Sequence, residues 1–438
     1  SSTMIMPLCT GKGRVLISNP GVFGMTLISR AALRRLGGCA LALMLPLAPA
    51  LAQAPAPARP QQAAADKSQA EFRRFLDGLW AEARGQGISR ATFDAALKGA
   101  SPDPKIVALT KKQSEFVQPI WRYLAGAVGG ERIGRGREVA AEWNAVLDRI
   151  EATYGVPRSV VLGVWGMETN YGGFTGNLDV FRSLATLAFA QYRGDFFRKE
   201  LLTALRILED GRAARPAMRG SWAGAMGHTQ FMPSSYLKFA VDGDGDGRAD
   251  IWASIPDALA STANYLRRHG WQPGLPWGFE VALPEGFDFR NQRQGFAGWS
   301  ALGVRRADGN AMPASGEASL FLPAGARGPA FLVTANYDVI KTYNSSDAYA
   351  LGVAHLGDRI FGGAAVRGTW PKDEPMLNAL QRQELQRRLA ELGFYSGNTD
   401  GKFGSMTREA VRAFQLHRGI LPDGYADIAV LEHLREVR

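Results

Sequence analysis

One stretch of this 438-residue chain limits its fold more than any other, the uninterrupted apolar run from Val160 to Met167. On a helix, these residues cover nearly every face, so the helix must be buried on all sides. Such a helix needs other helices packed around it, and a chain of this length can supply them. We therefore expect a helical domain with this run at its centre.

The first charged residue after Val160 is Glu168, and Asn170–Gly173 (NYGG) then ends the helix. A carboxyl group at the C-terminal end of a buried helix is desolvated and faces the negative pole of the helix dipole. Both effects raise its pKa. A general acid that works near neutral pH needs such a carboxyl group. The alternative interpretation is a structural carboxylate bonded to a neighbouring backbone group.

The pattern of apolar residues divides the rest of the chain. Helical periodicity dominates residues 70–268 and returns at 347–361. Between them, residues 271–328 form short apolar runs separated by Gly and Pro, as expected of short strands and loops. A linker at 364–375 precedes a compact unit at 376–438. The predicted fold class is mainly α, of the α+β type, with a small β insertion.

The first 52 residues resemble a targeting segment. A positively charged stretch is followed by an apolar run and by a small-residue cleavage pattern that ends at Ala52. We expect an upstream extension, a signal peptide at about 25–52, and secretion to the periplasm of a Gram-negative bacterium. Residues 53–67 are rich in Pro, Ala and Gln and predict a flexible leader. The main domain is then expected at 68–363.

Both cysteines, Cys9 and Cys39, lie in that first segment. Cys39 ends a Leu-Gly-Gly-Cys box that resembles a lipid-attachment site, but the box precedes the main apolar run and we expect no lipid anchor. The remaining chain has no thiol nucleophile, disulfide or cysteine-ligated zinc. Half of the net charge of +10 also lies in the first 52 residues. The remainder is too dispersed for a dedicated nucleic-acid binder.

A second cluster runs from Ser221 to Tyr236 with the sequence SWAGAMGHTQFMPSSY. Its Gly and Ala residues let the backbone approach a ligand closely. Ser221 and Gln230 offer neutral hydrogen-bonding groups, which suit a sugar ring better than a phosphate. His228 is more simply interpreted as a structural hydrogen-bonding group than as a catalytic base.

An acidic segment, Asp242–Arg248 (DGDGDGR), follows directly. Its oxygen donors at positions 1, 3 and 5, its Gly at 6 and the carbonyl of Arg248 match the start of an EF-hand calcium loop. Position 12 is Ala253 in place of Glu, and Asp250 or Asp257 could supply the missing oxygen. Without a cation, three aspartates that alternate with glycines would repel one another. We expect a structural Ca²⁺ or Na⁺ with no part in the chemistry; a solvated acidic turn is the alternative.

Near the end of the main domain, Tyr343 and Asn344 place an aromatic ring beside an amide. This pair suits stacking on a sugar and hydrogen bonding to an N-acetyl group. A helix cap at Ser346 or Asp347 accounts for the same segment equally well and does not exclude the first interpretation.

Several segments, taken in order, resemble the lytic murein transglycosylase B family across about residues 68–363. They are GVWGMETNYG, ATLAFAQYRGDFFRKEL, GSWAGAMGHTQFMPSSY, the acidic loop with DIW after it, ANYLRRHGW and YNSSDAYALGV. The last unit, over residues 377–434, resembles the small three-helix peptidoglycan-binding domain through LQRRLAELGFYSGNTDGKFGSMTREAVRAFQLHRGILPDG.

The resemblance implies a lysozyme-like domain with one catalytic glutamate, Glu168. It implies non-hydrolytic cleavage of the MurNAc-β-1,4-GlcNAc bond of peptidoglycan to 1,6-anhydro-MurNAc ends, assisted by the substrate N-acetyl group. Peptidoglycan strands are the expected partner, with other cell-wall enzymes as further candidates, no nucleic acid, and a membrane only through a lipid anchor. The residues implied are a substrate set of Ser221, Gln230, Tyr265, Tyr343 and Asn344, and a cation set of Asp242, Asp244, Asp246, Arg248 and Asp257.

Other functions stay open at this point. A lysozyme would cut the same bond with water and would need a second acid near Glu168, for which Asp179 and Asp195 are candidates. A wall-binding protein without turnover would keep the calcium loop and lack a working Glu168. A spore or phage wall enzyme would differ in setting and not in chemistry.

Overall fold

The structure is a computed structural model that describes residues 60–110 and 118–437. The signal peptide, Cys9 and Cys39 lie outside the described residues. The α-helices are α1 (Pro60–Gly85), α2 (Arg90–Leu97), α3 (Pro104–Leu109), α4 (Ile120–Ala127), α5 (Gly130–Glu142), α6 (Asn144–Tyr154), α7 (Arg158–Thr169), α8 (Val180–Phe189), α9 (Phe196–Glu209), α10 (Pro233–Phe239), α11 (Ile255–Arg268), α12 (Phe296–Ala301), α13 (Ala335–Tyr343), α14 (Asp347–Ile360), α15 (Ala379–Glu391), α16 (Ser405–Arg418) and α17 (Ile428–Glu436).

The remaining elements are short. They are the 3₁₀ helix η2 (Arg215–Ala217) and the strands β1 (Leu178–Asp179), β2 (Arg219–Gly220), β3 (Gly278–Ala282), β4 (Arg293–Gly295), β5 (Arg305–Arg306), β6 (Glu317–Phe321) and β7 (Ala330–Val333). The prediction of a mainly helical chain with a small β insertion is therefore confirmed. No helix in the described part is both long and apolar enough to cross a membrane.

Two boundaries differ from those expected. Helix α1 begins at Pro60, inside the predicted leader 53–67, because a proline at the first helical position and the Ala-rich sequence after it favour a helix. The strands also continue beyond the expected limit at Gly328, since β7 pairs with both β3 and β6.

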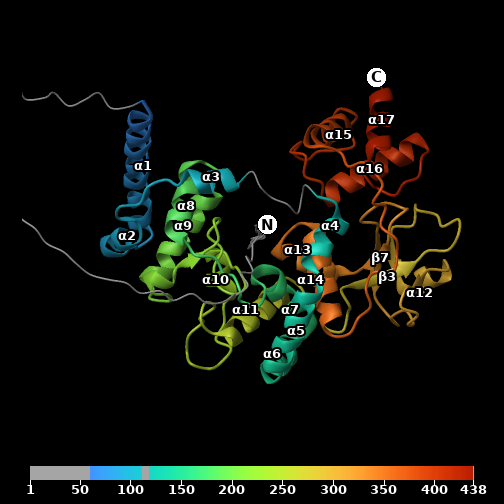
Figure 1. The fold of residues 1–438 in the computed structure, drawn as a ribbon, viewed down its shortest axis with the longest axis horizontal. Helices are drawn as coiled ribbons and strands as arrows, with labels where there is room; N and C mark the ends of the chain where they lie inside the picture. Colours follow the sequence, from blue (N-terminus) through green and yellow to red (C-terminus); the bar gives the residue numbers. More distant parts are fainter. Residues whose placement is uncertain (1–59, 111–117, 438) are drawn as a thin grey trace, which may run out of the picture.

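Figure 1 shows how the helices and the sheet are arranged. Helices α1, α2, α3, α8 and α9 form one lobe, α5, α6, α7, α10 and α11 lie in the middle, and the sheet lies on the far side. The sheet is antiparallel with the strand order β4-β6-β7-β3-β5. Its separate core includes Phe279, Trp299 and Leu332, with α12 packed beside β4.

Helices α7 and α14 pack closely at the centre of the molecule, where glycines bring their backbones together. The interior of α7 from Val160 to Met167 is buried throughout, as the sequence predicts. A Cβ atom on Gly357 would lie 2.4 Å from the carbonyl oxygen of Ser159, near the start of α7. Near the other end of α7, a Cβ atom on Gly352 would lie 2.9 Å from the Met167 side chain. The two helices therefore run antiparallel, and the C-terminal end of α7 meets the first turns of α14.

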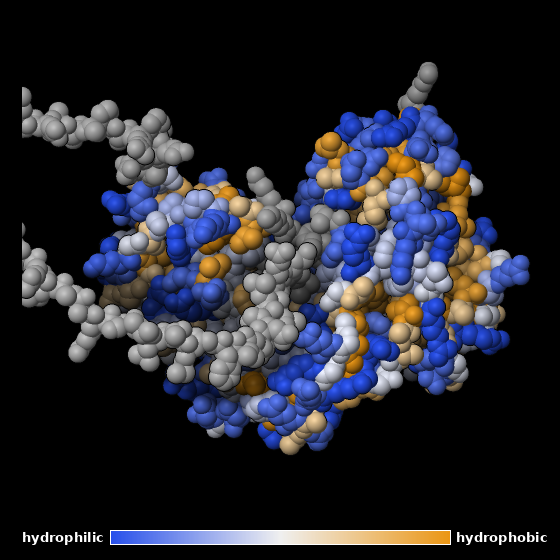
Figure 2. Space-filling model, viewed as in Figure 1, coloured by the Kyte–Doolittle hydropathy of each residue, from blue (hydrophilic) through white to orange (hydrophobic). Residues whose placement is uncertain are grey.

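The C-terminal helices α15, α16 and α17 surround a core of their own, which contains Leu385, Leu389, Val411, Phe414 and Leu431. Large hydrophobic side chains also remain exposed in this unit, and orange residues are visible on it in Figure 2. The exposed large hydrophobic residues of this unit are Met376, Leu380, Met406, Leu416 and Leu421.

Candidate active site

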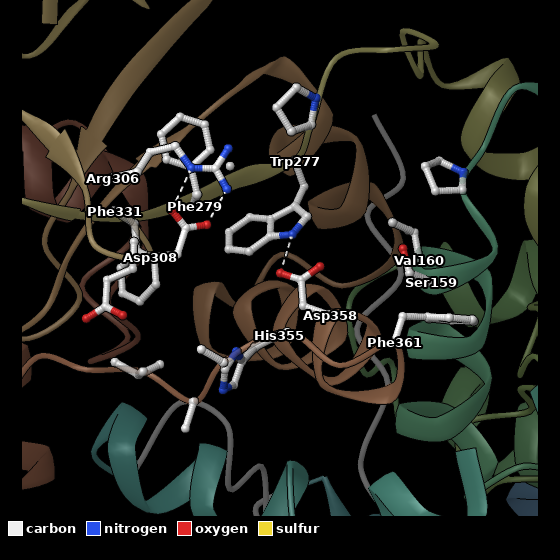
Figure 3. Close-up of a pocket in the computed structure, with 18 of the residues that line it drawn as sticks. Ser159, Val160, Trp277, Phe279, Arg306, Asp308, Phe331, His355, Asp358 and Phe361 are labelled. Atoms are coloured by element: carbon white, nitrogen blue, oxygen red, sulfur yellow. Dashed lines mark hydrogen bonds and ion pairs between the residues drawn. The ribbon is translucent and has the colours of Figure 1, made fainter. Parts of the chain in front are cut away.

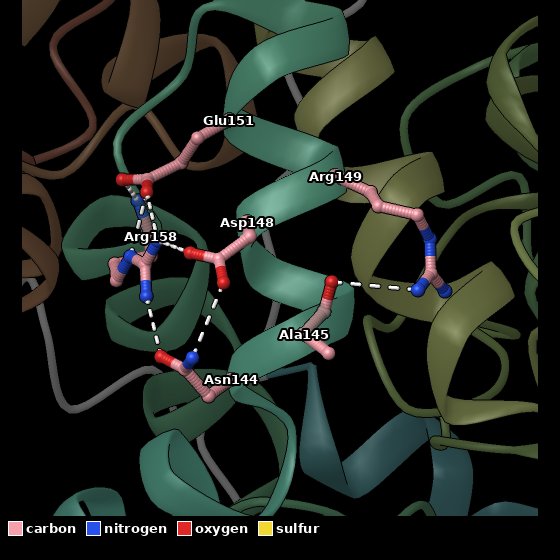
Figure 4. A network of polar contacts seen from close by, with 6 residues as sticks. All are labelled: Asn144, Ala145, Asp148, Arg149, Glu151 and Arg158. Carbon is pink, nitrogen blue, oxygen red and sulfur yellow. Dashed lines mark hydrogen bonds and ion pairs between the residues drawn. The ribbon is translucent and has the colours of Figure 1, made fainter.

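Helix α7, which carries Glu168 in its last turn, is fixed at both ends. At its start, the guanidinium group of Arg158 donates to Glu151 at 2.6 Å and to Asn144 at 2.8 Å, and it forms an ion pair with Asp148 (Figure 4). At its end, Asn170 has a φ of 51°, a left-handed conformation that stops the helix. These contacts fix the two ends of the helix that carries Glu168.

Glu168 Oε1 accepts a hydrogen bond of 2.5 Å from the phenol of Tyr349. Glu168 is half-buried, while Tyr349, in the first turn of α14, is 1% exposed. The pKa of Tyr349 is raised well above its ordinary value, mainly by burial and also by the negative charge of Glu168. The phenol therefore keeps its proton and acts as the donor. A carboxyl group with a fixed neutral donor is suited to take up and release protons in one orientation.

Two predicted substrate residues, Tyr343 and Tyr265, are buried. Burial and the nearby charge of Glu168 raise the pKa of Tyr343 well above its ordinary value. Its hydroxyl donates to the carbonyl of Thr229 at 3.0 Å, and that of Tyr265 donates to the carbonyl of Thr342 at 2.8 Å. The two rings meet edge to face with centroids 4.8 Å apart. The structure thus places Tyr343 within the electrostatic influence of Glu168 and packs Tyr265 against Tyr343.

The Gly/Ala cluster packs against the loop that follows α7. Gln230, which is 7% exposed and has a φ of 54°, donates through Nε2 to the carbonyl of Thr175 at 2.9 Å. Ser221 is 4% exposed, and its Oγ accepts from the backbone N–H of Ala225 at 3.1 Å. A Cβ atom on Gly176 would lie 2.3 Å from the backbone of Gly220, which precedes Ser221. The predicted pair therefore lies beside the segment that continues from Glu168.

His228 has a structural environment. Trp165 Nε1 donates to its Nδ1 at 3.2 Å, and Thr169 donates to its backbone carbonyl at 2.8 Å. Burial lowers the pKa of the imidazole, so the ring is neutral at physiological pH. A Cβ atom on Gly172 would lie 2.4 Å from the ring, so this position needs a glycine. These contacts support the structural interpretation of His228.

Asn344 contributes to the turn before α14. Its side chain is 1% exposed, and Oδ1 accepts from the backbone N–H of Ser346 at 3.0 Å. Ser346 in turn caps α14 by accepting from the N–H of Tyr349 at 3.4 Å. The cap expected at Ser346 is present, and it holds the backbone of the residue that donates to Glu168. Contact between Asn344 and substrate stays a prediction.

The acidic loop brings three predicted cation ligands together. One oxygen atom each from Asp242, Asp244 and Asp257 lies within 4.8 Å of the others. Asp257, in the first turn of α11, is fully buried and accepts from the N–H groups of Gly243 and Asp250, both at 2.7 Å. Desolvation raises the pKa of Asp257, the nearby charge of Asp244 adds to the rise, and the N–H donors of Gly243 and Asp250 oppose it. Three oxygen ligands in this arrangement fit a hard cation such as Ca²⁺.

The other two predicted ligands lie outside this three-aspartate group. Asp246 Oδ1 accepts from the backbone N–H of Arg248 at 2.8 Å. Asp250, considered as a replacement for position 12, instead accepts from the N–H groups of Trp252 and Ala253, both at 2.9 Å. The roles of Asp246 and of the Arg248 carbonyl stay predictions.

Comparison with known proteins identifies the family. A family model described as the transglycosylase SLT domain matches residues 71–358, more than half of the chain. The chain belongs to the lytic transglycosylase family. A model described as a putative peptidoglycan-binding domain matches residues 378–434 of this lytic transglycosylase. Both resemblances found in the sequence are therefore confirmed.

Three relatives document the similarity. The membrane-bound lytic murein transglycosylase B of Escherichia coli is 34% identical over 245 residues, which cover 55% of this chain and 66%, just under two thirds, of that relative. SltB3 from Pseudomonas aeruginosa, solved in complex with NAG-anhNAM-pentapeptide, is 46% identical with a TM-score of 0.77 over 83% of this chain and 99% of its own. Slt35 from Escherichia coli, solved with calcium, is 29% identical with a TM-score of 0.56 over 66% of this chain and 92% of its own.

The local sequence of this lytic transglycosylase does not mark Tyr349 as a functional residue. It lies within the segment YNSSDAYALGV, next to the buried Ala348 and Ala350, and looks like an ordinary core residue. The available signal was the helix cap at Ser346, which places Tyr349 in the first turn of a helix. Only the packing of α14 on α7 brings its hydroxyl to Glu168.

A cavity of about 460 Å³ lies at the opposite end of the α7–α14 pair (Figure 3). Trp277 Nε1 donates to Asp358 Oδ2 at 3.1 Å there, and burial raises the pKa of Asp358 to about 7. Burial also lowers the pKa of His355 to about 4. The cavity is lined by residues near the start of α7, so it is separate from the end that carries Glu168.

Proposed function

We propose that this lytic transglycosylase cleaves the MurNAc-β-1,4-GlcNAc bond of peptidoglycan without water and leaves 1,6-anhydro-MurNAc ends. The observation that carries the proposal is the hydrogen bond from Tyr349 to Glu168, which gives a half-buried carboxyl group one fixed neutral donor. A single oriented carboxyl group suits a reaction in which the same residue acts first as acid and then as base.

In the first step, the Glu168 carboxyl group gives its proton to the glycosidic oxygen as the bond to the muramic C1 breaks. The carbonyl oxygen of the substrate N-acetyl group then bonds to C1 and stabilises the cation. In the second step, the Glu168 carboxylate takes the proton of the C6 hydroxyl, and O6 forms the new bond to C1. The N-acetyl group is released, Glu168 is protonated again, and no water is consumed.

The contacts of the two rival acids favour this route over hydrolysis, which needs a second carboxylate in most glycosidases. Asp179 forms an ion pair with Arg215 at 2.6 Å and accepts from the N–H of Arg182 at the start of α8. Asp195 is exposed where α9 begins. Asp179 is thus already committed to other partners, and Asp195 lies in solvent.

The three-aspartate group would hold a structural cation, for which we propose Ca²⁺. The donors are hard oxygen atoms, and the buried carboxylate of Asp257 lies close to the carboxylates of Asp242 and Asp244. Slt35, a relative with the same overall fold, was solved with calcium. The ion would join the loop to the start of α11 and so stabilise the region around Tyr265.

We further propose that the C-terminal unit binds the cell wall and that the enzyme acts in the periplasm. The match to a peptidoglycan-binding model and the similarity to SltB3, which was solved with peptidoglycan fragments, support the first statement. The signal-like sequence that ends at Ala52 supports the second. The division into a catalytic domain at 68–363 and a wall-binding domain at 376–438 belongs to the same proposal.

The test is mass spectrometry of the soluble products from purified sacculi digested with this protein. Products lighter by one water than the hydrolysed muropeptides would support a lytic transglycosylase. Hydrated ends would show a lysozyme, and an absence of products from folded protein would indicate a binding protein without turnover.

A further inference from the structure

The C-terminal unit contacts the catalytic region through a buried charge. Arg408, in the first turn of α16, donates through Nη1 to Asp347 Oδ2 at 2.5 Å. Asp347 is 9% exposed and is the first residue of α14. The guanidinium group of Arg408 also lies over the ring of Phe321, 5.2 Å from its centroid. Loss of this ion pair is costly, because the buried Asp347 carboxylate would keep its charge in a low-dielectric site with one cation fewer.

Asp347 is held from the catalytic side as well. Lys341, from α13, lies 3.0 Å from Asp347 Oδ1, and Tyr337 donates to the backbone carbonyl of Asp347 at 3.0 Å. Each carboxylate oxygen of Asp347 therefore has a cation, and the one on Oδ2 comes from a separate domain. A second contact between the same units runs from the N–H of Ala326 to Asp423 Oδ2 at 3.0 Å. The C-terminal unit is thus docked and not merely tethered.

Asp347, which Arg408 contacts, lies two residues before Tyr349, the donor to Glu168. Asp347 begins the helical turn that contains Tyr349, and Tyr349 donates to Glu168. A shift of this turn would move the Tyr349 hydroxyl directly, since a helical turn moves as a unit. Changes of about 1 Å in a catalytic arrangement can cost ~100-fold in rate.

From these contacts we infer that Arg408 is a positioning residue for catalysis: by holding Asp347, it sets the first turn of α14 so that Tyr349 reaches Glu168. The wall-binding domain would then act on the rate of the reaction as well as on attachment to the wall. This inference rests on the proposed function, because it assigns Glu168 the acid and base steps.

The test is a double-mutant cycle in the full-length chain, with R408A, Y349F and the double variant. The substrate is a soluble MurNAc-GlcNAc tetrasaccharide, so that attachment to the wall does not enter the rate. If Arg408 acts through Tyr349, R408A lowers kcat by about 10-fold with little change in KM. In the Y349F background the same substitution has almost no further effect. R408K, which keeps the charge, recovers part of the rate.

The matched control is R418A on the same helix. Arg418 pairs with Glu436 inside the C-terminal unit, at 3.3 Å, and should leave kcat unchanged. Circular dichroism and melting temperature check folding, and R408Q replaces R408A if the alanine variant fails to fold.

Three results would overturn the inference. Equal losses from R408A in both backgrounds would show a general structural effect. Unchanged kcat together with weaker sacculus binding would make Arg408 a wall contact only. If the wild-type protein forms anhydro products and R408A has the same kcat, this inference fails and the proposed function stands. If the wild-type protein forms no anhydro products, the proposed function fails as well.

Discussion

A Cβ atom placed on Gly163 of α7 would lie 2.3 Å from the carbonyl oxygen of Val353 in α14. No real side chain fits at that distance, so the two helices touch through their backbones. This contact lies between Glu168 and the start of α7, and it fixes how closely the helix that carries Tyr349 approaches the helix that carries Glu168.

Gly163→Ala should therefore force the two helices apart. Overpacking of this kind costs about 1–3 kcal/mol of stability, and we expect a lower melting temperature together with a lower kcat. Gly134→Ala, on α5, is the matched control because a Cβ atom there meets nothing within 4 Å. It should keep full activity and melt at the same temperature or slightly higher. Equal behaviour of the two variants would contradict the role of the contact.

Glu168→Gln should abolish turnover and leave the fold intact. The amide keeps the size of the side chain and can still accept from Tyr349, but it can neither give nor take the proton. Release of anhydro products from sacculi measures the loss, and the melting temperature checks the fold. Retained activity in the folded variant would rule out Glu168 as the acid and base.

The pKa of Asp358, raised by burial from 3.8 to about 7, makes stability depend on pH. Below pH ~4 the carboxyl group is protonated in both states; above it, the unfolded chain releases the proton first. The free energy of unfolding therefore falls as pH rises from about 4 to about 7, by up to about 1.4 kcal/mol per pKa unit.

Asp358→Asn removes this titration and keeps an acceptor for Trp277. Relative to the wild type, the variant should gain stability between pH 5 and pH 8, as measured by urea denaturation at both values. Asp195→Asn, which removes an exposed carboxyl group where α9 begins, serves as the matched surface control. Parallel pH dependence of the wild type and Asp358→Asn would contradict the prediction.

Calcium should raise the melting temperature of the wild-type protein, and chelation should reverse the gain. A ligand at 100 times its Kd stabilises the folded state by about 2.7 kcal/mol. Asp244→Ala removes one of the three close carboxylates and should lose the response. Asp288→Ala, which breaks only a surface pair with Arg290, should respond like the wild type. If Asp244→Ala still responds fully, the ion binds elsewhere.

The sequence predicted what depends on local order. The apolar run of α7, its termination at Asn170 and the position of Glu168 follow from neighbouring residues, and so does the acidic loop. The sequence could not predict that Tyr343 and Tyr265 are buried and donate hydrogen bonds from their hydroxyls to backbone carbonyls. Both rings suit a sugar-binding surface and a protein core equally well. Periodicity does not distinguish the two environments.

The sequence also could not predict contacts between segments that are distant along the chain. Tyr349 and Arg408 acquire their partners only when α14 packs on α7 and α16 docks on α14. Asp257 illustrates the intermediate case: the missing position 12 of the loop pointed to a later aspartate, but only the structure brings Asp257, and not Asp250, to Asp242 and Asp244. Local pattern can predict that a ligand is missing without predicting which residue replaces it.

The hydrogen bond between Tyr349 and Glu168 joins residues 181 positions apart. A chain cut before residue 349 contains the carboxyl group without its donor. Contacts of such long range form late in folding, because the closure of a large loop must come first. The order of the sequence thus delays the completion of the Tyr349–Glu168 pair until nearly the whole catalytic region has folded.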